Sequence, residues 1–256
     1  MRPSAAFGWT VALWVLTLLA IRLTEAARPG AAYDLVNLGA CQTLAVLVVV
    51  FVILRVYTPD GSVRAALGLR PLAWWQLVLS AGLGAGLYPS LAMIERALIE
   101  RFPYEADELA QLEKLDTLHS TSHRLVFIAI AFGILPLTRE IFFRGMLFEQ
   151  LARAAPARTA ILATSVCFAF ALDLRTVPTA LILGLALGRL RSSTGTVLGP
   201  VVAELAFWTI PSVSVARGLE PNADIAYPTR YVVVGAVAAL LALILVGWRG
   251  GTGRHE

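Results

Sequence analysis

Charged residues are scarce in this chain of 256 residues: Asp, Glu, Lys and Arg make up 15% of it, against 58% hydrophobic residues. Soluble domains carry about 25% charged and about 45–50% apolar residues. Together with a mean hydropathy of +0.74, this shortage of charge argues against a disordered chain, a coiled coil and an ordinary soluble enzyme. It predicts an all-α, polytopic helical membrane protein.

Lysine and cysteine are also rare. Lys114 is the only lysine among 21 basic residues, and the arginines are scattered, with no basic run or basic helix face. The net charge of +4 therefore does not indicate a nucleic-acid-binding protein. The two cysteines, Cys41 and Cys167, lie inside apolar runs and are expected to be small core residues. We expect no cofactor and no metal.

Apolar runs long enough to cross a bilayer, about 20 residues each, recur along the whole chain. Because they leave no room for a soluble domain, residues 1–256 are predicted to form a single integral membrane domain. The runs predict a bundle of about eight transmembrane helices, at residues 7–27, 35–57, 72–94, 125–148, 158–173, 177–191, 196–213 and 230–248.

Basic residues predict how this bundle is oriented. With an even number of spans both termini share a side. Placing that side in the cytoplasm puts ten basic residues in inside loops and eight in outside loops. Four of those eight lie in or beside one long loop, and the positive-inside rule counts short loops. We therefore expect a multi-pass protein of the cell membrane, in the bacterial cytoplasmic membrane, with both termini cytoplasmic.

The long loop, residues 95–124, is the only sizeable polar segment. Leucines recur there at steps of three and four residues among seven acidic residues, which predicts an extracytoplasmic amphipathic segment at the membrane surface. His119 and His123 stand four residues apart, a spacing that suits a metal ion on a helix, but no third ligand lies nearby. A solvated surface pair is the simpler interpretation.

Five ionisable residues fall well inside predicted spans, where each costs at least about 2.5–3.5 kcal/mol. They are Arg139, Glu140, Arg144, Asp173 and Glu204. Glu140 and Arg144 stand four residues apart and share one helix face. This pair is either a self-neutralising structural contact or an acid/base group whose ionisation Arg144 fixes.

The depth of these residues in the membrane predicts which of them meet. At 1.5 Å per residue, Glu140 and Glu204 both lie about 12 Å from the inner surface, whereas Asp173 lies at about 22 Å. We therefore expect the carboxyl groups of Glu140 and Glu204 to meet, and Asp173 to join them only if its short helix is tilted.

The string Arg139-Glu140-Ile-Phe-Phe-Arg144-Gly145 resembles the Glu-Glu-x-x-x-Arg-Gly motif of the CPBP family. That family comprises the CAAX prenyl proteases and the bacteriocin-processing and immunity proteins. Residues 67–71, 184–188 and 194–203 are also similar to it. The similarity covers about residues 60–210, with a core resembling the CPBP/CAAX protease domain at about 120–212. The resemblance implies an eight-helix intramembrane glutamic endopeptidase.

Most of the family's catalytic residues are replaced in this chain. Arg139 stands where the family has its first Glu, Asp173 and Glu204 where it has two His, and Trp208 where it has Asn. In the family, that first Glu and the two His are understood to activate water and to stabilise the oxyanion. The resemblance therefore implies a degenerate centre without its general base. The motif positions that form the candidate catalytic site are Glu140, Arg144, Asp173 and Glu204, with Arg139 and Trp208 as departures.

Three functions stay open at this point. The first is a pseudoenzyme of the CPBP family, a peptide- or protein-binding or immunity-type membrane protein in which the five buried charges sum to −1 and close into an ion-pair network. The second is an active intramembrane endopeptidase using Glu140 with the Asp173 and Glu204 carboxylates. The third is a transporter or an ion or proton relay. We expect membrane lipids and a peptide or protein substrate or client as partners, and no nucleic acid.

Overall fold

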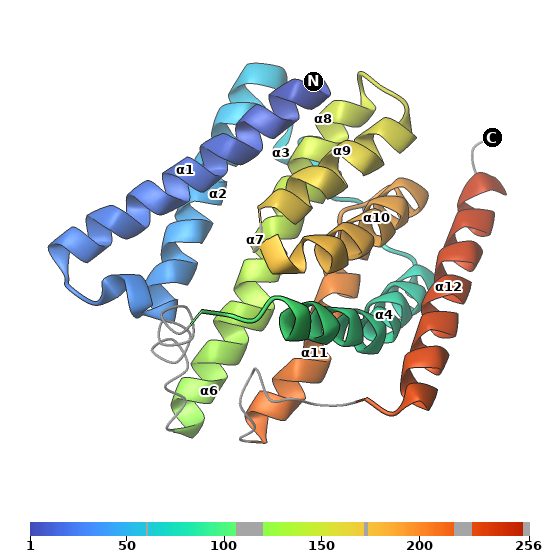
Figure 1. Cartoon of the computed structure of the whole chain (residues 1–256). Helices are drawn as coiled ribbons and strands as arrows, with labels where there is room; N and C mark the ends of the chain where they lie inside the picture. The colour runs from blue at the N-terminus through green and yellow to red at the C-terminus, as the bar shows by residue number, and fades with distance from the viewer. Residues whose placement is uncertain (60, 106–119, 172–173, 218–226, 253–256) are drawn as a thin grey trace.

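The computed structural model describes residues 1–59, 61–105, 120–171, 174–217 and 227–252, and their secondary structure is helical (Figure 1). Both termini of the described chain lie towards the same end of the bundle, as an even number of spans requires (Figure 1). Six helical paths are long and apolar enough to cross a membrane: α1 (Pro3–Ala27), α2 (Leu35–Tyr57), α4 (Trp74–Arg101), Thr121–Ala152, α11 (Leu198–Ala216) and α12 (Thr229–Thr252).

The two remaining predicted spans form the shorter helices α9 (Ala157–Phe170) and α10 (Val177–Thr194). Each of the eight predicted segments therefore contains a helix, which confirms the polytopic all-α bundle. Local signals set several helix ends. The Asp34 side chain caps α2 by accepting from the backbone N–H groups of Val36 and Asn37, and Gly195 ends α10 with a φ of +69°.

The helix of the third predicted span is longer than the span itself and enters the polar segment 95–124. α4 continues past residue 94 to Arg101, and an ion pair between Arg96 and Glu100 (2.9 Å) supports this added length. At the other end, α6 (Thr121–Phe127) takes residues that we assigned to the segment. Residues 106–119, including His119, lie outside the described residues, so the amphipathic segment stays a prediction.

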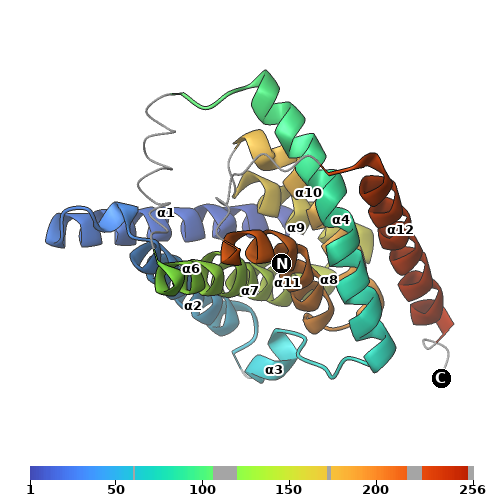
Figure 2. The same ribbon diagram turned by 90° about the horizontal axis from the view of Figure 1, so that it is seen from below.

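The helices form two groups on either side of a central path. α1 and α2 pack together on one side, α4 and α12 pack together on the other, and the path Thr121–Ala152 runs between them with α11 (Figures 1 and 2). Close crossings hold α4 in place. A Cβ at Gly84 would overlap the Ala203 carbonyl oxygen of α11, and a Cβ at Gly86 would lie 2.6 Å from the Gly235 carbonyl oxygen of α12.

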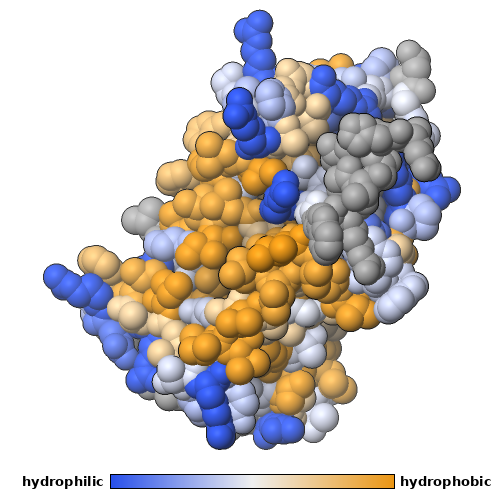
Figure 3. Space-filling model, turned by 90° about the vertical axis from the view of Figure 1, so that its right-hand side faces the viewer, coloured by the Kyte–Doolittle hydropathy of each residue, from blue (hydrophilic) through white to orange (hydrophobic). Residues whose placement is uncertain are grey.

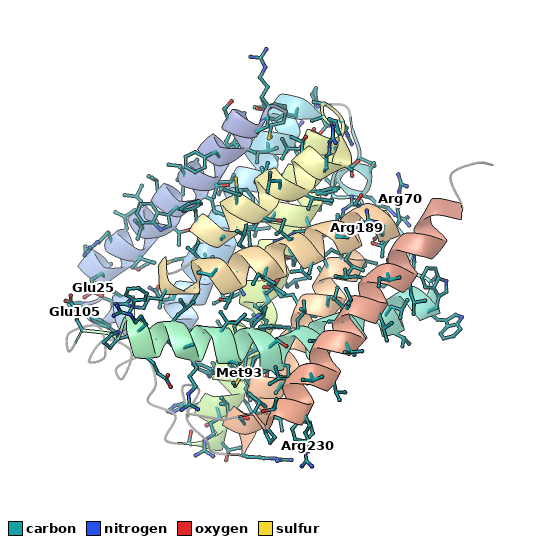
Figure 4. All side chains as sticks on the ribbon, turned by 45° about the vertical axis from the view of Figure 1, so that its right-hand side comes forward. Glu25, Arg70, Met93, Glu105, Arg189 and Arg230 are labelled. Atoms are coloured by element: carbon teal, nitrogen blue, oxygen red, sulfur yellow. The ribbon has the colours of Figure 1, made fainter. Side chains whose placement is uncertain are left out.

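The outer surface of the bundle is apolar. Large hydrophobic side chains are exposed on α1, α2 and α12, among them Trp14, Leu47 and Val234. Figure 3 shows apolar side chains gathered across the middle of one face, with hydrophilic ones towards its rims. Figure 4 places Arg70 and Arg189 at one end of the bundle and Arg230 at the other. This pattern fits a protein surrounded by lipid.

Candidate functional site

The motif residues lie on a helical path that departs twice from regular α-helix. Its second and fourth segments, η2 and η3, are π-helical turns, in which an N–H donates to the carbonyl five residues back: Leu135 to Ile130 and Phe148 to Phe143. π turns are rare and frequently mark functional sites. The successive segments are α6, η2 (Ile128–Ile134), α7 (Leu135–Glu140), η3 (Ile141–Leu147) and α8 (Phe148–Ala152).

Glu140 and Arg144 form a fully buried ion pair, as their spacing predicts. Arg144 Nη1 lies 2.8 Å from Glu140 Oε1, and both side chains are 0% exposed. The other end of the guanidinium donates from Nη2 to the Gly184 carbonyl of α10 at 3.1 Å, and its Cζ lies 4.4 Å from the centre of the Phe168 ring. These three contacts fix Arg144 in one orientation.

Arg139 is paired with Glu204. Its Nη2 lies 3.0 Å from Glu204 Oε1, and Glu204 is 1% exposed. The Arg139 Cζ also lies 5.9 Å and 6.0 Å from the ring centres of Phe168 and Trp208. Trp208, at the position of the family's Asn, makes no hydrogen bond through its buried indole Nε1; it stacks on Phe132 at 5.3 Å. Its indole ring therefore provides an aromatic contact beside Arg139 and no hydrogen bond.

The carboxyl groups of Glu140 and Glu204 meet, as the depth estimate predicts. They face each other within reach of a side-chain hydrogen bond. Each uses its Oε1 on an arginine, while the two Oε2 atoms are buried and have no donor. Arg139, Glu140, Arg144 and Glu204 thus form one cluster from α7, η3 and α11, hereafter the four-residue cluster. With all four ionised its net charge is zero.

Two further sequence predictions concern Asp173 and the pair His119 and His123. Asp173 lies outside the described residues, so its part in the predicted ion-pair network stays a prediction. His123 is exposed in the first turn of α6, and its partner in the pair, His119, lies outside the described residues. Over the part of the chain that the structure describes, no group of three or more His, Cys, Asp or Glu side chains is arranged to hold a metal ion.

Sequence reasoning missed a third ion pair, Arg191–Glu149, in which the arginine is buried and also contacts the backbone of Arg144. Arg191 and Glu149 lie 2.7 Å apart, and Arg191 also donates from Nε to the backbone carbonyl of Arg144 at 3.0 Å. Arg191 is one of the ten basic residues that the orientation argument assigns to inside loops, yet its side chain is only 4% exposed. The available signal was its spacing from Gly184 and Gly188, which puts all three on one face of α10.

The segment that follows α3 (Val63–Ala66) packs over the Arg191–Glu149 pair. Gly68 has a φ of +63°, and a Cβ there would overlap the Arg191 guanidinium. Its carbonyl accepts from the Val197 N–H at 3.2 Å, while Arg70 and Thr196 exchange two hydrogen bonds of 3.3 and 2.8 Å. The string 67–71, similar to the CPBP family, therefore ties the start of α4 to the α10–α11 connection.

Comparison with known proteins bears on this core. Residues 121–210 match the family model for Type II CAAX prenyl endopeptidase Rce1-like proteins. A search of curated proteins found no match, and a search of solved structures found none either. The matched segment begins at the first residue of α6 and ends inside α11, so it contains the whole four-residue cluster and Trp208. The match at residues 121–210 therefore supports an Rce1-like type II CAAX prenyl endopeptidase domain, of the CPBP family of intramembrane endopeptidases.

Proposed function

We propose that this protein is a CPBP-family membrane protein that binds a peptide or protein client and has lost hydrolytic catalysis. One observation carries the proposal: Arg139, at the position of the family's first Glu, is bonded to Glu204, at the position of a family His. A guanidinium has no acceptor atom and stays protonated, so it does not take a proton from water. The mechanism expected of the family thus lacks its base.

The enclosure of the four-residue cluster supports the same conclusion. Hydrolysis requires a water and a peptide carbonyl to contact the catalytic carboxyl group. Glu140, Arg144 and Glu204 are 0–1% exposed, and Arg139, at 15%, is the most exposed member. An apolar groove of about 430 Å³ lies between α2 and η2, and no cluster residue lines it. Arg139 therefore covers carboxylates that an active enzyme presents to its substrate.

The test compares the reconstituted full-length protein with its Glu140→Ala variant against a peptide library that includes prenylated peptides. We expect no cleavage that depends on Glu140, and we expect some peptides to be retained on the immobilised protein and recovered intact by mass spectrometry. Cleavage by the unaltered protein that Glu140→Ala removes overturns the proposal, and so does a library from which nothing is retained.

A restored variant serves as the matched control for the assay. Arg139→Glu, Asp173→His, Glu204→His and Trp208→Asn together return all four departures to the family's residues. Cleavage by this variant, but not by the unaltered chain, locates the loss of activity in these positions. It also shows that reconstitution and substrates support hydrolysis.

The second candidate is an active intramembrane endopeptidase. The adjacent carboxyl groups of Glu140 and Glu204, each with an Oε2 atom that no donor reaches, favour it, because two adjacent carboxyl groups that share a proton can act together as acid and base. In that case the unaltered chain should cleave peptides, and the rate of cleavage should fall at least about 100-fold in both Glu140→Gln and Glu204→Gln.

A further inference from the structure

The two buried carboxyl groups of the four-residue cluster lack a hydrogen-bond donor between them. Glu140 Oε2 and Glu204 Oε2 are each buried without a partner, although the two groups face each other within hydrogen-bond reach. Nearby donors do not fill the gap, since the Nε atoms of Arg139 and Arg144 also make no hydrogen bond. Buried carboxylate oxygens without a donor are costly, and one hydrogen placed between the two would satisfy both.

The charges around Glu140 and Glu204 also favour one hydrogen placed between their carboxyl groups. Among the described residues, the charged groups that act on Glu140 are Arg144, Glu204 and Arg139. Each arginine binds an Oε1 atom and leaves the Oε2 atom of the same carboxyl group without a donor. From the other elements packed here, α9 contributes the Phe168 ring and α10 the Gly184 carbonyl. Two carboxyl groups at hydrogen-bond distance favour sharing one proton over placing two negative charges side by side.

We propose that Glu140 and Glu204 share one proton between their Oε2 atoms at neutral pH. The four-residue cluster is then a buried proton-binding site with a net charge of +1. This inference goes beyond the proposed function, because it concerns the state of the carboxyl pair whether or not the protein cleaves or binds a peptide.

Infrared spectroscopy of the full-length protein in lipid nanodiscs at neutral pH tests the proposal. A protonated carboxyl group gives a carbonyl stretching band separate from that of carboxylates, and labelling glutamate with ¹³C at the side-chain carboxyl shifts the band. We expect such a glutamate band in the unaltered protein, and its loss in both Glu140→Gln and Glu204→Gln. The Gln amide keeps a donor in place while removing the shared proton, so either variant is expected to remain folded.

Glu149→Gln is the matched control, because Glu149 is also ion-paired with an arginine but lies outside the cluster. The band should survive in this variant. A band that survives in Glu140→Gln or Glu204→Gln, or that Glu149→Gln removes, overturns the proposal. So does an unaltered protein without the band, whatever the variants show. Peptide cleavage does not enter these outcomes, so they are distinct from the test of the proposed function.

Discussion

Arg191 holds the backbone of Arg144: its Nε donates to the Arg144 carbonyl at 3.0 Å, while its Nη2 binds Glu149 at 2.7 Å. The Arg144 side chain in turn binds Glu140. A charge near the end of α10 is thus connected, through one residue of the π turn η3, to the buried carboxyl pair.

We predict that Arg191→Met destabilises the protein by about 1–3 kcal/mol, because it leaves the buried Arg144 carbonyl and a Glu149 oxygen without their donors. Unfolding by SDS titration in mixed micelles measures the loss. Arg153→Met is the matched control, since Arg153 pairs with the same Glu149 at 3.6 Å but is 44% exposed. It should cost no more than about 1 kcal/mol. Equal losses would contradict the prediction.

The Glu140–Arg144 pair should behave as a unit. Glu140→Leu or Arg144→Met alone leaves one uncompensated buried charge, for which we expect a loss of about 3–5 kcal/mol. The double variant removes both charges and should be less destabilised than either single variant. A double-mutant cycle on unfolding free energies measures this coupling. Additive losses would show that the two side chains do not depend on each other.

Arg139→Ala tests whether the Arg139–Glu204 ion pair stabilises the cluster. It leaves Glu204 buried without its arginine, and we expect a loss of about 3–5 kcal/mol, visible as a lower melting temperature in detergent. Arg158→Ala, at an exposed position near the start of α9, is the control and should change stability by no more than about 0.5 kcal/mol. An unchanged melting temperature for Arg139→Ala would contradict a stabilising ion-pair network.

The crossing of α4 and α11 gives a prediction that involves no charge. Gly84→Ala places a Cβ against the Ala203 carbonyl and should destabilise the protein by about 1–3 kcal/mol. Gly82→Ala, two residues earlier on α4, meets nothing within 4 Å and should be neutral or up to about 1 kcal/mol stabilising. SDS unfolding of the two variants side by side measures the contrast. A similar loss in both would place the effect outside the crossing.

Asp34, in the loop between α1 and α2, should contribute to the stability of the fold in a pH-dependent way. Partial burial opposes its ionisation, but hydrogen bonds from Arg28 and from the N–H groups of Asn37 and Val36 hold the pKa of Asp34 below its ordinary value of 3.8. Because the folded pKa is the lower one, ionised Asp34 stabilises the fold above pH 3.8, and that contribution is lost as the pH falls through the folded value.

The measurement for Asp34 compares the unaltered chain with Asp34→Asn, which keeps a cap but loses the charge. The unaltered chain should be more stable at about pH 7, and the difference should be smaller at about pH 2, below the ordinary Asp value of 3.8. A stability difference of the same size at both values would assign the effect to something other than ionisation.

The fold and part of the site could be predicted because they depend on local pattern and depth. Apolar runs locate the helices, the four-residue spacing pairs Glu140 with Arg144, and equal depths bring Glu140 to Glu204. Such arguments do not predict contacts between helices, because these depend on the rotation of each helix about its own axis. The Arg139–Glu204 pair joins residues 65 positions apart, and nothing in the spacing shows that Arg139 faces α11.

The contacts of Arg191 and the π turns could not be predicted, for related reasons. The spacing of Arg191 from Gly184 and Gly188 puts it on the face of α10 that they share, but only the packing of α8 and η3 decides which groups it binds. Residues 141–147 contain no proline and no distinctive pattern, because a π turn depends on how its neighbours pack.

The two π turns also make the angular position of the cluster sensitive to chain length. Each residue of an α-helix advances the side-chain direction by about 100°, and a π turn holds one residue more than the α-helical turn that it replaces. Deleting one residue from η3 would allow a regular α-helix there. The helix on one side of the deletion would then rotate by about 100° about its axis relative to the other side. Arg191 would then meet a different carbonyl. The cluster is therefore defined by helical phase as well as by its charged residues, and substitution alone would not reproduce it on an uninterrupted α-helix.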